Sequence, residues 1–325
     1  MTEFILRRLL QSALVLAAMS LLVFAGVYAI GNPLDILVNP QATPAEVAEA
    51  SRVLGLDRPL WEQYFRFAAN AMHGDLGVSF VAGVPAVQLI VDRMPATLEL
   101  AAAAMLIAIG LGLPLGLWAG LKPDSLTGRS ILAGSILGFS LPTFWVGLML
   151  ILVFSIQLGV LPSTGRGETI NVFGVPLSFL TPDGLAHLLL PAVTLALFKL
   201  ALVIRLVRAG IQEVIQLDYI RFARAKGLRR RRVLLVHALR NILVPVVTVL
   251  GLELGNVIAF AVVTATVFAW PDMGKLLIDS INLLDRPVVV AYLLIVVLMF
   301  TLINLAVDIL YSLLDPRVRL SGASS

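Results

Sequence analysis

The stretch RLVRAGIQEVIQLDYIRFARAKGLRRRRVLLVHALRN, residues 205–241, decides the fold. It contains ten lysine or arginine residues against two acids, and long apolar runs flank it on both sides. Charges of this density are too costly to place in hydrocarbon, whereas the flanking runs are apolar enough to cross it. Residues 205–241 are therefore predicted to be a polar connection between two membrane-spanning helices.

The composition of the whole chain supports the same class. Hydrophobic residues make up 59% of the 325 residues and charged residues 14%, whereas soluble domains carry about 25% charged residues. The chain has no cysteine, which excludes disulfides, thiolate metal sites and a cysteine nucleophile. The sequence thus predicts an all-α polytopic membrane protein.

Six apolar runs are long enough to span a bilayer core of about 30 Å. The first also resembles a signal peptide, but its 22 residues exceed the usual 7–15 residues of such a segment, so we expect a retained helix, with a cleaved signal as the alternative. The predicted spans are residues 9–30, 97–121, 130–160, 187–207, 242–270 and 288–314. The span at 130–160 contains Pro142 and is so long that it must tilt, kink or project.

The distribution of charge predicts the orientation. With six spans and a cytoplasmic N-terminus, the cytoplasmic segments carry a net charge of +11 and the outer segments −5, as the positive-inside rule requires. Both termini are then cytoplasmic, and short amphipathic helices are expected in the outer segment, one of them beginning with a capping box at Thr43–Glu46. The predicted parts are an N-terminus with the first helix (1–30), a periplasmic segment (31–95), a core with helices 2–6 (96–314) and a cytoplasmic tail (315–325).

Motifs for catalysis or nucleotide binding are absent from the sequence. There is no phosphate-binding G-x-x-x-x-G-K-[ST] loop, no H-E-x-x-H and no G-x-S-x-G. We therefore predict that the chain is not an enzyme, has no catalytic residue, and holds no cofactor or metal. If ATP drives transport, another polypeptide must hydrolyse it.

Two ionisable residues lie near the middle of their predicted spans, Lys199 in the fourth and Glu253 in the fifth. Such a residue costs roughly 2.5–3.5 kcal/mol on insertion scales. The two could form a structural ion pair or could line a translocation path, and both hypotheses stay open at this point. A third ionisable residue, Glu99, lies near the outer end of its span and is expected to extend its carboxylate to the interface.

Within the basic segment, residues 221–228 read RFARAKGL. Small residues at Ala223 and Ala225 allow close approach of another surface, and Gly227 can end a helix through a positive φ. The pattern indicates a short helix, a turn and a second helix that together form a docking surface for a cytoplasmic partner. Orientation of the chain and attraction to anionic lipid explain part of the charge. Nucleic-acid binding is disfavoured, because aromatic stacking residues are scarce.

These residues resemble ABC importer permeases of the dipeptide/oligopeptide branch (DppB/OppB-like), and the resemblance covers essentially the whole chain. It is carried by DYIRFARAKGLRRRRVLLVHALRNILVPVV at 218–247 and, in chain order, by ILRRLLQS, LGLDRPLWEQYFRF, HGDLGVSF, RMPATLELA, FSLPTFWVGLMLI, LGVLPSTG, HLLLPAVTLAL and YSLLDPRVRL. Related permeases move dipeptides, oligopeptides, glutathione, opines or nickel, so the resemblance leaves the substrate open.

The resemblance implies a type I importer permease in the bacterial cytoplasmic (inner) membrane. The implied partners are a second homologous permease subunit, two cytoplasmic ATPase subunits that bind ATP and magnesium, and a periplasmic or lipid-anchored solute-binding protein, besides membrane lipid. Ala223 and Gly227 match the alanine and glycine of the general E-A-A-x-x-x-G coupling pattern. The implied ATPase-coupling residues are Arg221, Ala223, Ala225, Lys226 and Gly227.

The chain departs from the family pattern at the end of the fifth span. Ala265 stands where the family commonly has glutamate, and Asp272 where it commonly has glycine. The other class of function that the residues allow is a proton-coupled secondary transporter that would use Lys199, Glu253 and Asp308.

Overall fold

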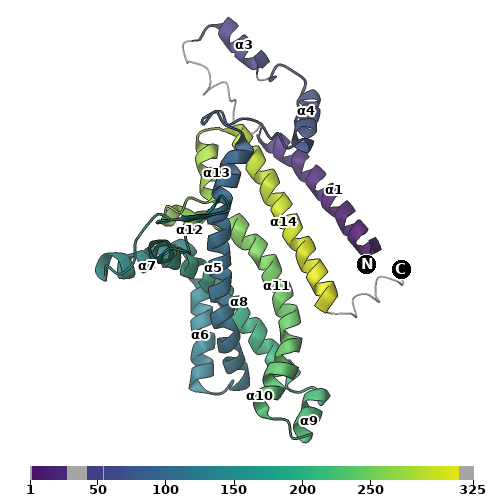
Figure 1. The fold of residues 1–325 in the computed structure, drawn as a ribbon, viewed down its shortest axis with the longest axis vertical. Helices are drawn as coiled ribbons and strands as arrows, with labels where there is room; N and C mark the ends of the chain where they lie inside the picture. The colour runs from purple at the N-terminus through teal and green to yellow at the C-terminus, as the bar shows by residue number, and fades with distance from the viewer. Residues whose placement is uncertain (1, 28–41, 54, 315–325) are drawn as a thin grey trace. The chain divides into compact units, whose positions relative to one another are not determined.

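The computed structural model describes residues 2–27, 42–53 and 55–314, and this part of the chain is mostly helical (Figure 1). The chain divides into two compact units. Unit 1 comprises residues 1–95 and 271–302, and unit 2 comprises residues 96–270 and 303–325. Two long helices, α5 (Ala86–Leu121) and α14 (Arg286–Leu314), have residues in both units.

The described helices include three that are long and apolar enough to cross a membrane: α5, α8 (Pro182–Val214) and residues Arg286–Ile309 of α14. Two bent helix pairs raise the number to five if each pair forms one span. Helix α1 (Thr2–Val27) adds a shorter apolar stretch, Leu10–Gly26. Six spans therefore remain a prediction. Parts of the predicted first span, outer segment and cytoplasmic tail lie outside the described residues.

In unit 1, two short helices, α3 (Pro44–Val53) and α4 (Leu60–Met72), occur in the segment that the sequence predicts to lie outside the membrane. The predicted capping box begins α3. Thr43 N donates to Glu46 Oε2 at 2.7 Å, and Glu46 N donates to Thr43 Oγ1 at 3.4 Å. Helix α4 packs on α1 through Tyr64, whose ring centroid lies 5.4 Å from that of Phe24.

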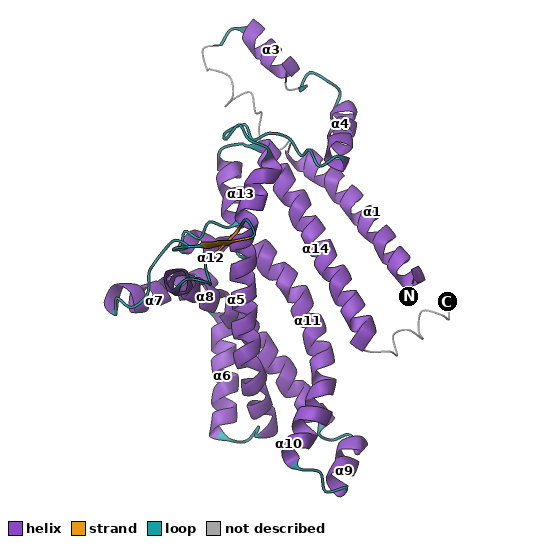
Figure 2. Cartoon of the chain, viewed as in Figure 1, coloured by secondary structure: helices purple, strands orange, loops and turns teal. Residues whose placement is uncertain are grey.

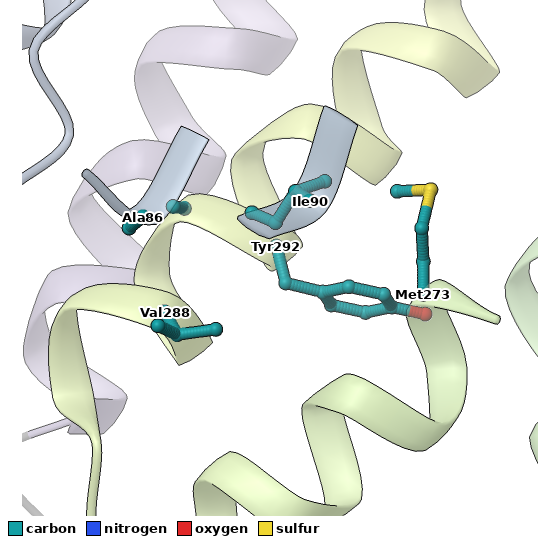
Figure 3. Close-up of a cluster of buried hydrophobic side chains, with 6 residues drawn as sticks. Ala86, Ile90, Met273, Val288 and Tyr292 are labelled. Carbon is teal, nitrogen blue, oxygen red and sulfur yellow. The ribbon is translucent and has the colours of Figure 1, made fainter. Parts of the chain in front are cut away.

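The core of unit 1 joins three elements that are distant in sequence. Buried side chains of the first turns of α5, of the start of α13 (Met273–Asn282) and of α14 form one cluster (Figure 3). Asp285, buried just before α14, holds the loop that precedes α5, because it accepts hydrogen bonds from Ser79 Oγ and from Phe80 N. The members of the cluster are Ala86, Ile90, Met273, Val288, Ala291 and Tyr292.

In unit 2, α8 is the central helix, and α6 (Leu126–Ser140), α7 (Thr143–Leu150), α11 (Leu239–Phe260) and α12 (Val262–Val267) all pack on it. Helix α5 also approaches α8 closely, because glycines four residues apart leave its contact face without side chains. A Cβ atom at Gly116 would lie 2.8 Å from Val207 Cβ and 3.0 Å from Ile204 O. This close packing fixes which face of α8 is left for other contacts.

The predicted third span is strongly bent. Helix α6 and residues 143–157, which comprise α7 and the π-helix η1 (Ile151–Gln157), meet at 105°. Leu141 has the extended conformation φ −83°, ψ 135°, as expected for a residue that precedes proline. Pro142 therefore makes the kink that the sequence allowed, and the bend is too sharp for one straight helix.

The outer loop of unit 2 differs from the all-α prediction in one detail. Strands β1 (Ile170–Val172) and β2 (Val175–Leu177) form an antiparallel hairpin, with Ile170 opposite Leu177 (Figure 2). The turn residues Phe173 and Gly174 both have positive φ, 52° and 85°, as a tight two-residue hairpin requires. The three-residue strands are too short for alternation of apolar residues to reveal them.

Candidate functional site

The basic segment forms a compact helical projection of unit 2 between α8 and α11 (Figure 1). After α8, the chain forms α9 (Asp218–Ala225), a turn, α10 (Arg230–Arg232) and the π-helix η2 (Val233–Ala238), and then continues into α11. Gly227 has φ +74°, and its amide donates to Arg224 O at 2.9 Å. The expected short helix, glycine-ended turn and second helix are therefore present.

Helix α9 has one face buried in this chain and one face exposed. Ile220 is fully buried and Ala223 is 7% exposed, so the small side chain of Ala223 serves the packing of α9 on its own chain. Ala225, two residues further on, is exposed. Only Ala225 of these two alanines therefore offers its side chain to another molecule.

The exposed face of α9 is basic and is held in a fixed position. Asn241 Nδ2, near the start of α11, donates to Tyr219 Oη at 2.5 Å, and this bond links α9 to the next helix. Lys226 Nζ lies 4.5 Å from the centroid of the Phe222 ring. The exposed face therefore presents an aromatic ring beside several cationic groups. The exposed residues between Arg221 and the turn are Arg221, Phe222, Arg224, Ala225, Lys226 and Gly227, and Asp218 and Tyr219 of the first turn of α9 are exposed as well.

The two mid-span ionisable residues form an ion pair. Lys199 Nζ, on α8, donates to Glu253 Oε2, on α11, and the side chains are 19% and 21% exposed. Asn256, one turn further along α11, donates weakly to Glu253 Oε1 at 3.5 Å. The structure thus brings together the two residues that the sequence paired, and adds Asn256, which its i+3 spacing from Glu253 could have indicated.

Asp308, the third residue of the proton-coupled alternative, lies on α14. It follows Val307, whose side chain occupies the position that a Cβ atom at Gly251 of α11 would take. Gly251 therefore allows α14 to pack closely on α11 near Glu253. The ion pair described above joins Lys199 and Glu253.

The expectation that Glu99 extends to the interface is wrong. Its side chain is 4% exposed and forms an ion pair with Arg166 of the outer loop, with Nη2 and Oε2 at 2.6 Å. Ser178 N also donates to Glu99 Oε1 at 2.6 Å. Arg166 is the one basic residue between positions 161 and 186. It was therefore the one candidate in that loop for an ion pair with Glu99.

Asp272 is the N-cap residue of α13. Its Oδ1 accepts from Lys275 N at 2.7 Å, which is the usual bond of an N-cap aspartate. The residue is 1% exposed, and Oδ2 has no hydrogen-bond partner among the described residues. Burial raises the pKa of Asp272 to about 6, although the amides of Lys275 and Gly274 and the charges of Arg93 and Lys275 lower it.

This raised pKa predicts a dependence of stability on pH. Between about pH 4 and pH 6 the folded chain binds more protons than the unfolded chain at this site, so stability falls as pH rises through that window. Above pH 6, the ionised and buried carboxylate of Asp272 lowers the free energy of unfolding by roughly 3 kcal/mol. Asp272→Asn keeps an oxygen for the cap and removes the charge. We expect it to raise the midpoint of thermal unfolding in detergent more at pH 7.5 than at pH 4.5.

The matched control for that prediction is Asp279→Asn on the same helix. Asp279 is 53% exposed and pairs with Lys275 at 2.8 Å, and such surface pairs contribute at most about 1 kcal/mol. Its replacement should change the midpoint little, without the steep trend between pH 4.5 and pH 7.5. An equal gain for Asp272→Asn at both pH values would show that its carboxylate carries no penalty in the folded chain.

In the described part of the chain, no three histidine, cysteine or acidic side chains lie together as a group that could hold a metal ion.

A basic projection, an intramembrane ion pair and several long apolar helices define the class, a polytopic membrane transport component. The chain belongs to the family of binding-protein-dependent transport system inner membrane components. Residues 112–320 match the model of that family, and residues 1–101 match its N-terminal model.

Curated relatives match over nearly the full length of the chain. The dipeptide transport system permease protein DppB of Escherichia coli K12 is 39% identical, over 98% of this chain and 99% of the relative. The di/tripeptide permease protein DppB of Pseudomonas aeruginosa is 41% identical over the same shares. The oligopeptide permease protein AppB of Bacillus subtilis is 37% identical. This chain is therefore a permease subunit of an ABC importer, and it is not an enzyme.

The fold has a counterpart among solved structures. A chain of the MetNI methionine ABC transporter in an inward-facing conformation superimposes with a TM-score of 0.54 and 17% identity, over 70% of this chain and 97% of that chain. The predicted all-α permease fold is therefore confirmed. Family membership also places the chain in the inner membrane, implies an ATPase and a binding protein as partners, and favours the importer over the proton-coupled alternative.

Proposed function

We propose that this chain forms half of the translocation path of an ATP-driven importer for short peptides. The names of its relatives, which transport dipeptides, tripeptides or oligopeptides, support this substrate class. The other half is a second homologous permease subunit. Two ATPase subunits bind ATP and magnesium on the cytoplasmic side, and a periplasmic or lipid-anchored binding protein delivers the peptide.

The exposed face of α9 carries the coupling part of this proposal. Ala225 leaves room for close contact, and Gly227 turns the chain away immediately after it, while Ile220 and Ala223 fix α9 on its own chain. A groove on an ATPase subunit can then move α9, and the motion passes through α8 and α11 into the spans. The division into an N-terminal helix with a periplasmic segment (1–95), a core (96–314) and a cytoplasmic tail (315–325), with both termini cytoplasmic, remains part of the proposal.

The test is uptake by the complete importer, reconstituted in proteoliposomes with its second permease, its ATPase subunits and its binding protein. We expect accumulation of radiolabelled alanyl-alanine only when ATP is present on the ATPase side and the binding protein on the other. Removal of either should abolish accumulation. Uptake that follows an imposed proton gradient without ATP would contradict the proposal and would support the secondary transporter.

A further inference from the structure

The ion pair between Lys199 and Glu253 joins α8 to α11 and is only partly covered by the described residues. Val203, one turn further along nearly the same side of α8, is fully buried in the contact with α5. Both charged side chains, by contrast, retain about one fifth of their exposure. On α11 the adjacent residue Leu252 is 44% exposed, whereas Val257, one turn beyond Glu253, is buried, so the pair lies at the border between the packed and the exposed surface of α11.

Charged groups within a membrane almost always face other protein or a water-filled cavity, because lipid cannot solvate them. The open side of the pair must therefore face either a partner subunit or the translocation path. In addition, the Lys199–Glu253 pair has hydrogen-bond donors and acceptors that are not fully used. Lys199 Nζ has three N–H donors, and Glu253 Oε2 is its acceptor in the described part of the chain, while Glu253 Oε1 has only the long bond from Asn256.

We propose that Lys199 and Glu253 bind the two charged termini of a peptide during its passage. Glu253 accepts hydrogen bonds from the terminal ammonium group, and Lys199 donates to the terminal carboxylate. This inference rests on the proposed function and names, for that function, a substrate with both termini free. When the path is empty, the two side chains neutralise each other, so neither charge is left without a partner.

The exchange favours a zwitterionic peptide for a physical reason. One ion pair is replaced by two, and every charge stays paired. A peptide whose amine is acetylated, or whose carboxylate is amidated, can satisfy only one side chain and leaves the other charge unpaired in a poorly solvated place. An extended dipeptide is roughly 7 Å long, a separation that the long side chains of lysine and glutamate can span by moving apart.

The experiment compares three radiolabelled probes in the reconstituted importer: alanyl-alanine, its N-acetylated form and its C-terminal amide. The variants are Lys199→Met, Glu253→Gln and the double variant, which keep approximate shape and remove charge. The binding protein is the same throughout, so its own preference cancels when each variant is compared with the wild type. Protein amount in the membrane and ATP hydrolysis stimulated by the loaded binding protein are measured in parallel.

We expect a crossover of preference. Lys199→Met should favour the amide over alanyl-alanine, and Glu253→Gln should favour the acetylated peptide, each by at least about tenfold relative to the wild type. The double variant has no unpaired charge, so it should assemble even if a single variant does not. We expect it to lose the preference for free termini and to transport alanyl-alanine at least about tenfold more slowly.

The outcomes separate this inference from the function on which it rests. Wild-type uptake that needs ATP, together with a double variant that keeps the wild-type preference among the probes, would overturn the inference and leave the importer intact. It would show that the pair serves only the packing of α8 on α11. Absence of ATP-dependent peptide uptake by the wild type would overturn the proposed function and the inference together.

Discussion

Replacing Ala225 with glutamate is expected to reduce peptide uptake at least about tenfold while the amount of permease in the membrane stays unchanged. Ala225 is exposed on the basic face of α9, and no packing in this chain depends on its small size. The new side chain adds bulk and a negative charge where an ATPase groove would close on α9. Uptake and ATP hydrolysis are measured in proteoliposomes, and hydrolysis should no longer respond to the loaded binding protein.

The same change at Ala223 is the matched control. Ala223 is 7% exposed, so a glutamate there would place a carboxylate among packed side chains, which costs several kcal/mol. We expect Ala223→Glu to lower the amount of folded permease, unlike Ala225→Glu. Normal uptake by Ala225→Glu at normal protein level would contradict the assignment of this face to ATPase coupling.

Gly227→Asp tests the turn after α9 in the same assay. Gly227 has a positive φ, and among the described residues, apart from its two chain neighbours, no heavy atom lies within 4 Å of the position that a Cβ would take. Aspartate tolerates this backbone region better than most residues, at a cost of about 1–2 kcal/mol. The variant should therefore insert normally and lose coupling, because a carboxylate then faces the docking partner.

Much of the site could be predicted from sequence because hydrocarbon excludes charge. The long apolar helices and the basic projection follow from counting residues between polar boundaries, and the same count placed Lys199 and Glu253 at similar depth, with an ion pair as one of two hypotheses. The roles of Ala223 and Ala225 could not be separated in this way. Residues two positions apart on a helix, such as these two alanines, point in directions about 200° apart. One of the two must therefore face the rest of the chain, but only the packing of α9 decides which.

The bends and the outer contacts depend on structure that is distant in sequence. Pro142 predicts a kink but not its angle of 105°, which is set by how α7 packs on α8 and α12. Glu99 was expected at the interface because its position near the end of a span is the only local signal. Its partner Arg166 lies 67 residues away, in an irregular loop whose path the sequence does not reveal.

Glu99→Ala is expected to destabilise the permease by about 3–5 kcal/mol, because it leaves the buried guanidinium of Arg166 without its counter-ion. The side chain of Arg166 is only 11% exposed, so water cannot replace the lost carboxylate. The same change removes the acceptor of Ser178 N and Ser178 Oγ. The midpoint of thermal unfolding in detergent should fall sharply, and the outer loop should become sensitive to protease.

A double-mutant cycle with Arg166→Met distinguishes the ion pair from general damage to the loop. If the two charges stabilise each other, Glu99→Met with Arg166→Met should be far less destabilising than the sum of the single changes, because no unpaired charge remains buried. Full recovery is not expected, since Arg166 Nη2 also donates to Pro176 O of β2 at 2.7 Å. Additive effects of the two changes would show that Glu99 acts through the amides of the loop, with Arg166 contributing only its bond to β2.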